Sequence, residues 1–521
     1  MKPLKLEDLT LEQKIGQLII VRGFLDEDDR KFIMEMTAKK AVGGFQLPYT
    51  EGGEKLIEEI NRTAGYPVLI CANMEYGFAG TTLKFPAQMA ISAADDEELA
   101  YKAAQVTAIE SKKYGFNMIW GPVVDLCARG RLCKNTRTFG DDPHLVSRFA
   151  TAMIKAYQDE GMLVTAKHYP GNSDIKDDSH LRPTNSQLTE QELLELDMIP
   201  YFEIMKQLEL SGIMTSHAIF DKIDPGIPST LSKKILSLIR KAGYDGLIQS
   251  DSLAMMSICQ QFGEKECIAM AIAAGCDQVL PNYRLPFKEV YEYLLDAYRQ
   301  GIITEQRLNE AVRRVLEAQA KTLKQPSSDC LKQEHIDTIE ELNKKSLCYL
   351  GKEGISPALS PDGKKVFVLA CENAFPGDVK ETAELEEKDT YSRKNVEKQG
   401  ALIKEYFPDA EIIIINEFPN NIQNERVALA ATKADDVIFC TYCRPHSYLG
   451  SDGITERMEY LINSNPEKTA AVLHVGNPYE ATKFPNAKRV FIGHLGGDSL
   501  KYTLKALKGE FIPTGKLPVT L

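Results

Sequence analysis

The sequence predicts an α/β protein whose first part is a (β/α)₈ TIM-like barrel and whose second part is a C-terminal α/β sandwich domain. The first observation is a series of eight short apolar runs before residue 320, separated from one another by amphipathic stretches. The second is a further series of five such runs after residue 364. Strands buried on both faces of a parallel sheet consist of short, nearly continuous apolar runs, so both series predict parallel strands joined by helices.

The first series predicts the barrel strands. They cover residues 18–21, 44–47, 68–71, 118–124, 163–166, 213–216, 247–250 and 278–280. Amphipathic patterns between them predict helices, for example at 98–114, 143–159, 189–207 and 233–242. Eight strand–helix units in about 300 residues are typical of a (β/α)₈ barrel, which we assign to residues 1–325.

The second series predicts a separate α/β domain over residues 347–521. Its strands are expected at 365–370, 411–415, 436–440, 470–475 and 489–492, with helices between them. Five alternating strands and helices favour an open sheet covered by helices. Residues 304–346, rich in Glu, Lys, Gln and Arg with a polar Pro326-Ser327-Ser328 turn, predict a last barrel helix, a turn and a connecting helix, and we assign residues 326–346 to the linker.

Composition and charge exclude several classes of partner. Hydrophobic residues make up 43% of the chain and charged residues 26%, which is typical of a globular protein. The net charge of −12 and the absence of a basic stripe argue against a nucleic-acid partner. The apolar runs are far too short to cross a membrane. We therefore expect neither nucleic acid nor membrane as a partner.

The N-terminus and the cysteines predict a cytoplasmic protein. No apolar core follows the basic start of the chain, so we expect no cleaved export signal. The eleven cysteines are scattered and odd in number, which favours reduced thiols over a disulfide framework. No metal site and no cofactor are predicted.

Polar side chains follow five consecutive strands of the predicted barrel. They are Asn73 and Glu75, then Asp125, then Lys167 and His168, then His217, and finally Asp251. Active groups of such barrels come from the C-terminal ends of the strands. Each residue alone could cap a strand, but five such strand ends at one face indicate a site, because burying charge is costly without a function.

The spacing is compatible with sugar chemistry, in which a carboxylate attacks an anomeric carbon and a second group protonates the leaving oxygen. Asp251 stands at the tip of a strong apolar run, in Gly246-Leu247-Ile248-Gln249-Ser250-Asp251. Ser250, Asp251 and Ser252 are also good helix N-caps. Spacing alone leaves the nucleophile and the helix cap both open.

Several motifs, in order along nearly the whole chain, resemble glycoside hydrolase family 3. The segment Lys167-His168-Tyr169-Pro170-Gly171-Asn172-Ser173, four residues, then Asp178-Ser179-His180 is similar to the pattern Lys-His-aromatic-Pro-Gly-His-Gly, four residues, Asp-Ser-His of the family's β-N-acetylglucosaminidase branch. Family-like segments also occur at 121–125, 136–143, 214–218, 228–232, 246–253 and 513–519.

This resemblance implies a retaining glycosidase without a cofactor that removes terminal β-linked N-acetylglucosamine, for instance from cell-wall fragments. It implies Asp251 as the nucleophile, His180 as the acid/base and Asp178 as the group that orients His180. Substrate contacts are implied for Asp125, Arg137, Lys167, His168 and Asn73. Arg137 could instead pair with Asp141 or Asp142, and His217 could equally be a packed barrel histidine or a ligand contact.

The chain departs from the family pattern at three positions. Asn172 and Ser173 replace a histidine and a glycine on the loop that carries His180, and Asn73 replaces an aspartate that binds sugar hydroxyls. Two other activities stay open: a β-glucosidase, against which the Asp-Ser-His segment argues, and a phosphorylase. A histidine acid/base is not an anion, so phosphate could approach the intermediate with little repulsion. From another class, a non-catalytic sugar-binding protein is disfavoured because Asp251 and His180 are both present.

Overall fold

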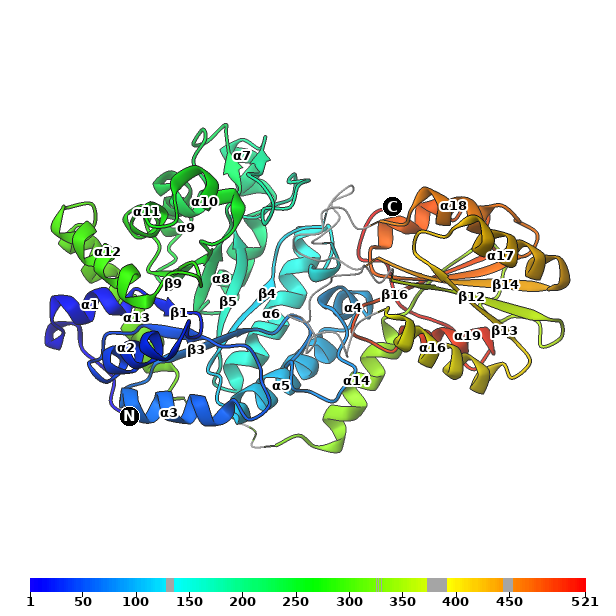
Figure 1. Ribbon diagram of the computed structural model, residues 1–521, viewed down its shortest axis with the longest axis horizontal. Helices are drawn as coiled ribbons and strands as arrows, with labels where there is room; N and C mark the ends of the chain where they lie inside the picture. Colours follow the sequence, from blue (N-terminus) through cyan, green and yellow to red (C-terminus); the bar gives the residue numbers. More distant parts are fainter. Residues whose placement is uncertain (128–134, 325, 327, 329, 373–390, 444–452) are drawn as a thin grey trace. The chain divides into compact units, whose positions relative to one another are not determined.

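The computed structural model describes residues 1–521 apart from 128–134, 325, 327, 329, 373–390 and 444–452. Figure 1 shows its helices and strands coloured along the chain. Among the described residues, no helix is both long enough and apolar enough to cross a lipid bilayer.

The first half of the chain forms the predicted barrel of eight parallel strands, neighbouring in the order β1-β2-β3-β4-β5-β7-β9-β10. These strands are β1 (Ile20–Val21), β2 (Gly44–Gln46), β3 (Leu69–Asn73), β4 (Met118–Val123), β5 (Leu163–Tyr169), β7 (Gly212–Thr215), β9 (Leu247–Ser252) and β10 (Gln278–Leu280). A parallel bridge between Ile19 and Val279 joins the first and last strands. The predicted fold class is therefore confirmed, and all eight strands lie within a few residues of their expected places.

Helices flank the barrel strands along the chain. They are α1 (Leu11–Gln17), α2 (Glu27–Ala38), α3 (Glu54–Ala64), α5 (Glu97–Tyr114), α6 (Pro143–Asp159), α7 (Glu190–Glu195), α8 (Ile199–Gln207), α9 (Lys233–Lys241), α10 (Met256–Phe262), α11 (Glu266–Ala274), α12 (Phe287–Arg299) and α13 (Glu305–Lys321). Local chemistry fixes their starts. For example, α6 begins at Pro143 because the Asp142 carboxylate accepts the backbone N–H groups of His144 and Leu145.

The single helix predicted over residues 189–207 is wrong, because the structure breaks it into α7 and α8. Pro200 lies in the first turn of α8, where its missing N–H does no harm, whereas inside a longer helix it would remove a hydrogen bond. The break also frees Asp197 from helical geometry, and this buried carboxylate accepts hydrogen bonds from the backbone N–H and hydroxyl of Ser173.

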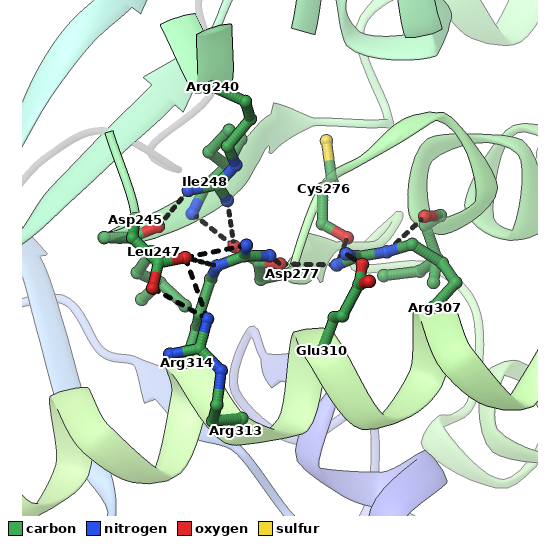
Figure 2. A network of polar contacts seen from close by, with 12 residues as sticks. Arg240, Asp245, Leu247, Ile248, Cys276, Asp277, Arg307, Glu310, Arg313 and Arg314 are labelled. Carbon is green, nitrogen blue, oxygen red and sulfur yellow. Dashed lines mark hydrogen bonds and ion pairs between the residues drawn. The ribbon is translucent and has the colours of Figure 1, made fainter. Parts of the chain in front are cut away.

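A network of ion pairs lies at the end of the barrel where β9 and β10 begin (Figure 2). Its centre is Asp277, directly before β10, whose side chain is 0% exposed. The carboxylate pairs with Arg240 of α9 at 2.7 Å, with Arg307 of α13, and with Arg314 of α13 at 3.2 Å. It also accepts the backbone N–H of Ile248 in β9 at 2.9 Å. One buried carboxylate thus links two strands to two helices, and its burial is compensated by several charged partners.

The second half of the chain contains a six-stranded sheet with the order β11-β16-β15-β14-β12-β13. The strands are β11 (Cys348–Gly351), β12 (Lys365–Cys371), β13 (Glu411–Asn416), β14 (Asp436–Tyr442), β15 (Thr469–Val475) and β16 (Arg489–Gly493). All five predicted strands are present, and they pair in parallel. The antiparallel edge strand β11 was not predicted.

Helices cover both faces of this sheet. Figure 1 shows α16 (Arg393–Tyr406) and α19 (Ser499–Leu507) on one face, and α17 (Asn421–Lys433) and α18 (Glu456–Asn463) on the other. Two more helices complete the description. They are α4 (Gln88–Ala93), between β3 and α5, and α14 (Gln333–Lys345), in the segment predicted to connect the domains.

Packing divides the chain into two compact units that are not contiguous in sequence. The first comprises Met1–Thr82, Glu97–Ala128 and Asp142–Ile336, and the second comprises Leu83–Asp96, Arg129–Asp141 and Asp337–Leu521. Leu83–Asp96 and the described residues 135–141, from the barrel half of the sequence, therefore group with the C-terminal unit. The contiguous division at residues 325 and 347 stays a prediction.

Candidate active site

Three of the predicted site residues continue rows of side chains that fill the barrel interior. Leu69 and Cys71 of β3, Leu163 of β5 and Leu247 of β9 belong to one buried cluster. Side chains alternate along a strand, so Asn73, Lys167 and Asp251 point to the same interior side two or four residues further on. We call the end of the barrel where these three residues lie the barrel mouth.

Asp251 is an ionised carboxylate held by donors and surrounded by imidazoles. Its side chain is 23% exposed, and its Oδ2 lies 3.8 Å from His168 Nε2. The backbone N–H of Ser252 donates to its Oδ1 at 2.6 Å. Burial alone raises the pKa of Asp251, but His168, His217, this N–H and His180 together hold it well below its usual range. The carboxylate is thus charged at neutral pH and open to a ligand.

His168 is oriented by Asp125. Its Nδ1 donates to Asp125 Oδ2 at 2.7 Å, because an ionised carboxylate can only accept. Asp125 also accepts the backbone N–H of His168 at 3.3 Å and the side-chain amide of Asn172 at 2.9 Å. The Asp125 side chain is 0% exposed. These contacts fix the His168 ring so that Nε2 faces Asp251, and they place Asp125 behind the ring.

Asp178 and His180 form a hydrogen-bonded pair. Asp178 Oδ1 accepts His180 Nδ1 at 2.7 Å and the backbone N–H of His180 at 2.9 Å. The Asp178 side chain is 3% exposed and that of His180 is 21% exposed. The carboxylate is therefore buried behind a ring that solvent and ligands can reach. Because Nδ1 is engaged with Asp178, Nε2 is the nitrogen suited to exchange a proton with a ligand.

The loop that carries this pair is anchored at both of its unusual residues. Asn172 donates to Asp125, and Ser173 donates its N–H and its hydroxyl to Asp197. Gly171 has a φ of 124°, and a side chain there would come within 2.4 Å of Asp197 Cβ, so only glycine fits. The replacements at 172 and 173 thus supply tethers of their own.

Lys167 contacts two residues at the end of β3. They are Asn73, the last residue of the strand, and Glu75, two positions later. The Lys167 ammonium group contacts Glu75 Oε1 at 2.6 Å and Asn73 Oδ1 at 2.8 Å. The side chains of Lys167 and Glu75 are only 2% and 7% exposed, whereas Asn73 is exposed. The two charges of this buried ion pair cancel each other. Asn73, which accepts from Lys167, is the residue of this group that is exposed at the barrel mouth.

His217 and Arg137 are placed differently from the other predicted residues. His217 is 2% exposed, donates from Nε2 to the carbonyl of Ser252 at 2.9 Å and lies 2.8 Å from Thr230 Oγ1 through Nδ1. These contacts favour the packed histidine over the ligand contact. Arg137 ends the short 3₁₀ helix η2 (Asn135–Arg137) and belongs to the second unit, so its predicted contact with a substrate stays a prediction.

Sequence reasoning missed Arg22, which follows β1 directly. Its Nη1 donates to the hydroxyl of Ser252 at 2.6 Å and its Nε donates to Gln46 Oε1 at 3.3 Å. Ser252 is the residue whose N–H holds Asp251, so Arg22 supports the carboxylate through one intermediate. Arg22 follows the predicted apolar run 18–21 as Asn73 and Lys167 follow the runs 68–71 and 163–166, and this signal could have identified it.

The structure holds a large cavity elsewhere. A space of about 700 Å³ lies where β7 and β9 begin, and Tyr244, Asp245 and Arg314 are among its lining residues. Its charged groups pair with one another, for example Arg314 with Asp245 at 2.8 Å. Because catalytic groups of such barrels lie where the strands end, the mouth remains the candidate site. In the described part of the chain, no three His, Cys, Asp or Glu side chains come together to hold a metal ion.

Solved structures share the fold over almost the whole chain. A glycoside hydrolase family 3 β-N-acetylglucosaminidase from Paenibacillus sp. str. FPU-7 superimposes with a TM-score of 0.83 at 24% identity, covering 98% of this chain and 99% of that one. A β-glucoside phosphorylase bound to 2FGlc also gives a TM-score of 0.83, at 21% identity, covering 99% of this chain and 95% of that one.

Sequence relatives match about half of the chain or more. A β-N-acetylglucosaminidase/β-glucosidase of Cellulomonas fimi is 28% identical over 333 residues, which is 60% of this chain and 58% of that protein. A β-hexosaminidase of Tolumonas auensis is 29% identical over 269 residues, which is 49% of this chain and 79% of that protein. Residues 10–318 match the glycosyl hydrolase family 3 N-terminal domain. With its barrel and more than half of its length matched, the chain belongs to glycoside hydrolase family 3.

Proposed function

We propose that the protein is a retaining exo-glycosidase that hydrolyses terminal β-linked N-acetylglucosamine from glycosides such as cell-wall fragments. The observation that carries the proposal is the combination of an ionised Asp251 at the barrel mouth with the Asp178–His180 pair joined at 2.7 Å. A nucleophile and a proton donor are the two groups that a double displacement needs. The relatives from Cellulomonas fimi and Tolumonas auensis support the sugar class.

In the first step, the Asp251 carboxylate attacks the anomeric carbon, and the bond from that carbon to the leaving oxygen breaks. His180 donates the proton on Nε2 to the leaving oxygen, and the Asp178 carboxylate stabilises the imidazolium that donates it. The low pKa of Asp251 suits this role, because the nucleophile has to be ionised while the acid beside it is protonated.

In the second step, a water molecule attacks the anomeric carbon of the glycosyl-enzyme. His180, now neutral, takes a proton from the water as the carbon–oxygen bond to Asp251 breaks. Two displacements on one carbon return the β configuration. The free carboxylate and the protonated histidine are then restored together.

His168, Asn73, Lys167 and Arg137 are proposed to hold the sugar. His168 directs Nε2 to the space beside Asp251, and Asn73 and Lys167 border the same mouth. We propose that Asp125 acts through His168, since its side chain is 0% exposed. Arg137 remains a proposed contact.

Phosphorolysis is the second candidate. The base of the second step is an imidazole without negative charge, which would not repel a phosphate dianion as a glutamate would. In that case phosphate replaces water as the acceptor and a sugar 1-phosphate is formed. A β-glucosidase is the third candidate, because the Cellulomonas relative carries both activities in its name.

The test uses chromogenic β-N-acetylglucosaminide and β-glucoside, each with and without phosphate. We expect the N-acetyl sugar to be preferred and Asp251→Ala to abolish its hydrolysis. The matched control is Asp245→Ala, since Asp245 lies among the residues lining the distant cavity and its side chain is 61% exposed. An active Asp251→Ala protein would remove Asp251 from the mechanism.

The intermediate and the acceptor can be identified directly. A slow fluorinated glycoside should leave a sugar covalently attached to a peptide that contains Asp251, detected by mass spectrometry. A sugar 1-phosphate as the main product in phosphate buffer would replace hydrolysis with phosphorolysis. Faster turnover of the glucoside than of the N-acetyl sugar would replace the proposed substrate class.

A further inference from the structure

Asn73 offers a hydrogen-bond donor to the barrel mouth. Asn73 Oδ1 lies 2.8 Å from Lys167 Nζ. The oxygen and nitrogen of such an amide are distinguished by their hydrogen-bond neighbours. Here the neighbour decides, because an ammonium group has three donors and no acceptor. The carbonyl oxygen has to face Lys167, and the amide nitrogen Nδ2 therefore faces away from it.

The two donor hydrogens of Nδ2 are available to a ligand. Within the described residues, Asn73 makes no side-chain hydrogen bond besides the one to Lys167. The residue is exposed and ends the interior row of β3 that begins with Leu69 and Cys71. A ligand in the mouth thus meets a donor at this position.

The charge around Asn73 supports the same conclusion. Lys167 is neutralised by Glu75 at 2.6 Å, and both side chains are buried. With an amide beside this pair the cluster has no net charge, whereas a carboxylate at 73 would add one negative charge and present only acceptors. An aspartate would require a ligand hydroxyl to donate, whereas the Nδ2 donors of the asparagine favour a ligand atom that accepts.

We propose that Asn73 determines specificity by donating to one substituent of the bound sugar, so that the protein accepts glycosides in which that hydroxyl is replaced by a group that can only accept. An ether, ester or carboxylate oxygen meets this condition, and so does fluorine. The inference rests on the proposed glycosidase function, because it assumes that the sugar under attack at Asp251 reaches Asn73.

The test compares wild type with Asn73→Asp on N-acetyl-β-glucosaminides in which the hydroxyl at ring position 3, 4 or 6 is replaced by fluorine. For each position we measure kcat/KM of the fluoro sugar divided by that of the parent. At one position the wild-type ratio should stay within about threefold of one, and in Asn73→Asp it should fall by about tenfold or more, because the new carboxylate faces fluorine unpaired.

Asn309→Asp is the matched control. Asn309 on α13 also accepts a lysine, Lys14 Nζ at 2.9 Å, but it lies on a helix outside the barrel interior. Its substitution should leave all three ratios unchanged. Asn73→Ala serves if Asn73→Asp does not fold: removal of the amide should weaken the parent and the fluoro sugar equally at the contacted position.

A binding measurement separates this inference from the proposed function. Titration calorimetry of the free fluoro sugars is done in the Asp251→Ala background, with and without Asn73→Asp, where no turnover is needed. Identical fluoro-to-parent ratios at all three positions in both proteins would overturn the role of Asn73. The role would also be overturned if replacement of the hydroxyl by fluorine lowered the wild-type kcat/KM by tenfold and Asn73→Ala removed this loss, because Asn73 would then accept a hydrogen bond from the hydroxyl. An active Asp251→Ala protein would contradict the nucleophile and leave the binding comparison valid.

Discussion

Replacement of Asp178 by asparagine tests the role of the carboxylate behind His180 with little change in geometry. Asp178 Oδ1 alone accepts both the Nδ1 proton and the backbone N–H of His180, at 2.7 and 2.9 Å. An asparagine retains this oxygen, and the backbone N–H keeps the carbonyl turned toward it, because only the oxygen can accept. The ring keeps its tautomer and orientation, while the negative charge beside it is lost.

The expected loss follows from the difference between two kinds of hydrogen bond. A bond to a charged group contributes about 1.5–3 kcal/mol and a neutral one about 0.5–1.5 kcal/mol, so the variant should lose about 1–2 kcal/mol of stabilisation of the imidazolium. This corresponds to a fall in rate of about 5- to 30-fold. The fall should appear with a methylumbelliferyl glycoside and be largely absent with a dinitrophenyl glycoside, whose leaving group needs no proton.

Asp177→Asn is the control for this measurement. Asp177 is the neighbouring carboxylate, its side chain is 45% exposed, and it pairs with Arg182 on the surface. Its substitution should change either rate by less than about twofold. The reasoning would be refuted if Asp178→Asn lowered the rate equally with both leaving groups, or lowered it with neither.

Three further predictions concern stability and pH. Asp277→Asn should lower the free energy of unfolding by about 3–5 kcal/mol, whereas Asp245→Asn, at a side chain that is 61% exposed, should cost less than about 1 kcal/mol; denaturant titration of both would show it, and equal losses would contradict the role of burial. Gly171→Ala should cost about 2 kcal/mol or more and reduce activity, measured by thermal melting and kcat, because the added carbon meets Asp197. Burial raises the pKa of Asp251, and the neighbouring imidazoles, chiefly that of His168, lower it. His168→Asn should therefore raise this pKa and move the acid limb of the pH profile of kcat/KM to higher pH. A limb that does not move would show that another group sets it. Since the folded-state pKa of Asp251 lies below its unfolded value, the stability that this group adds is present above about pH 4 and is lost as the pH falls further.

The barrel strands could be predicted because each is a short apolar run at a fixed place in a repeated unit. The edge strand β11 (Cys348–Gly351) could not, because it is half-buried and reads as neither a continuous run nor a helix. The break before α8 depended on Pro200 and on the distant partner of Asp197, and only the first of these is visible locally.

The candidate site shows the same division. Strand ends pointed to Asn73, Lys167, His168 and Asp251, because parallel strands finish at one end of a barrel. The direction of each hydrogen bond could not be predicted, since it depends on neighbours far apart in sequence. The orientation of the Asn73 amide, for instance, is set by Lys167, 94 positions later.

The interleaved composition of the two units bears on how this protein could be cut or recombined. The chain passes between the units five times, since six segments alternate between them. A fragment that ends near residue 336 would retain Leu83–Asp96 without the C-terminal sheet residues with which Ala93 forms a buried cluster. Such a fragment would expose apolar surface that the full chain buries. Chimeras that exchange the second unit with a relative should therefore exchange the two inserted segments as well.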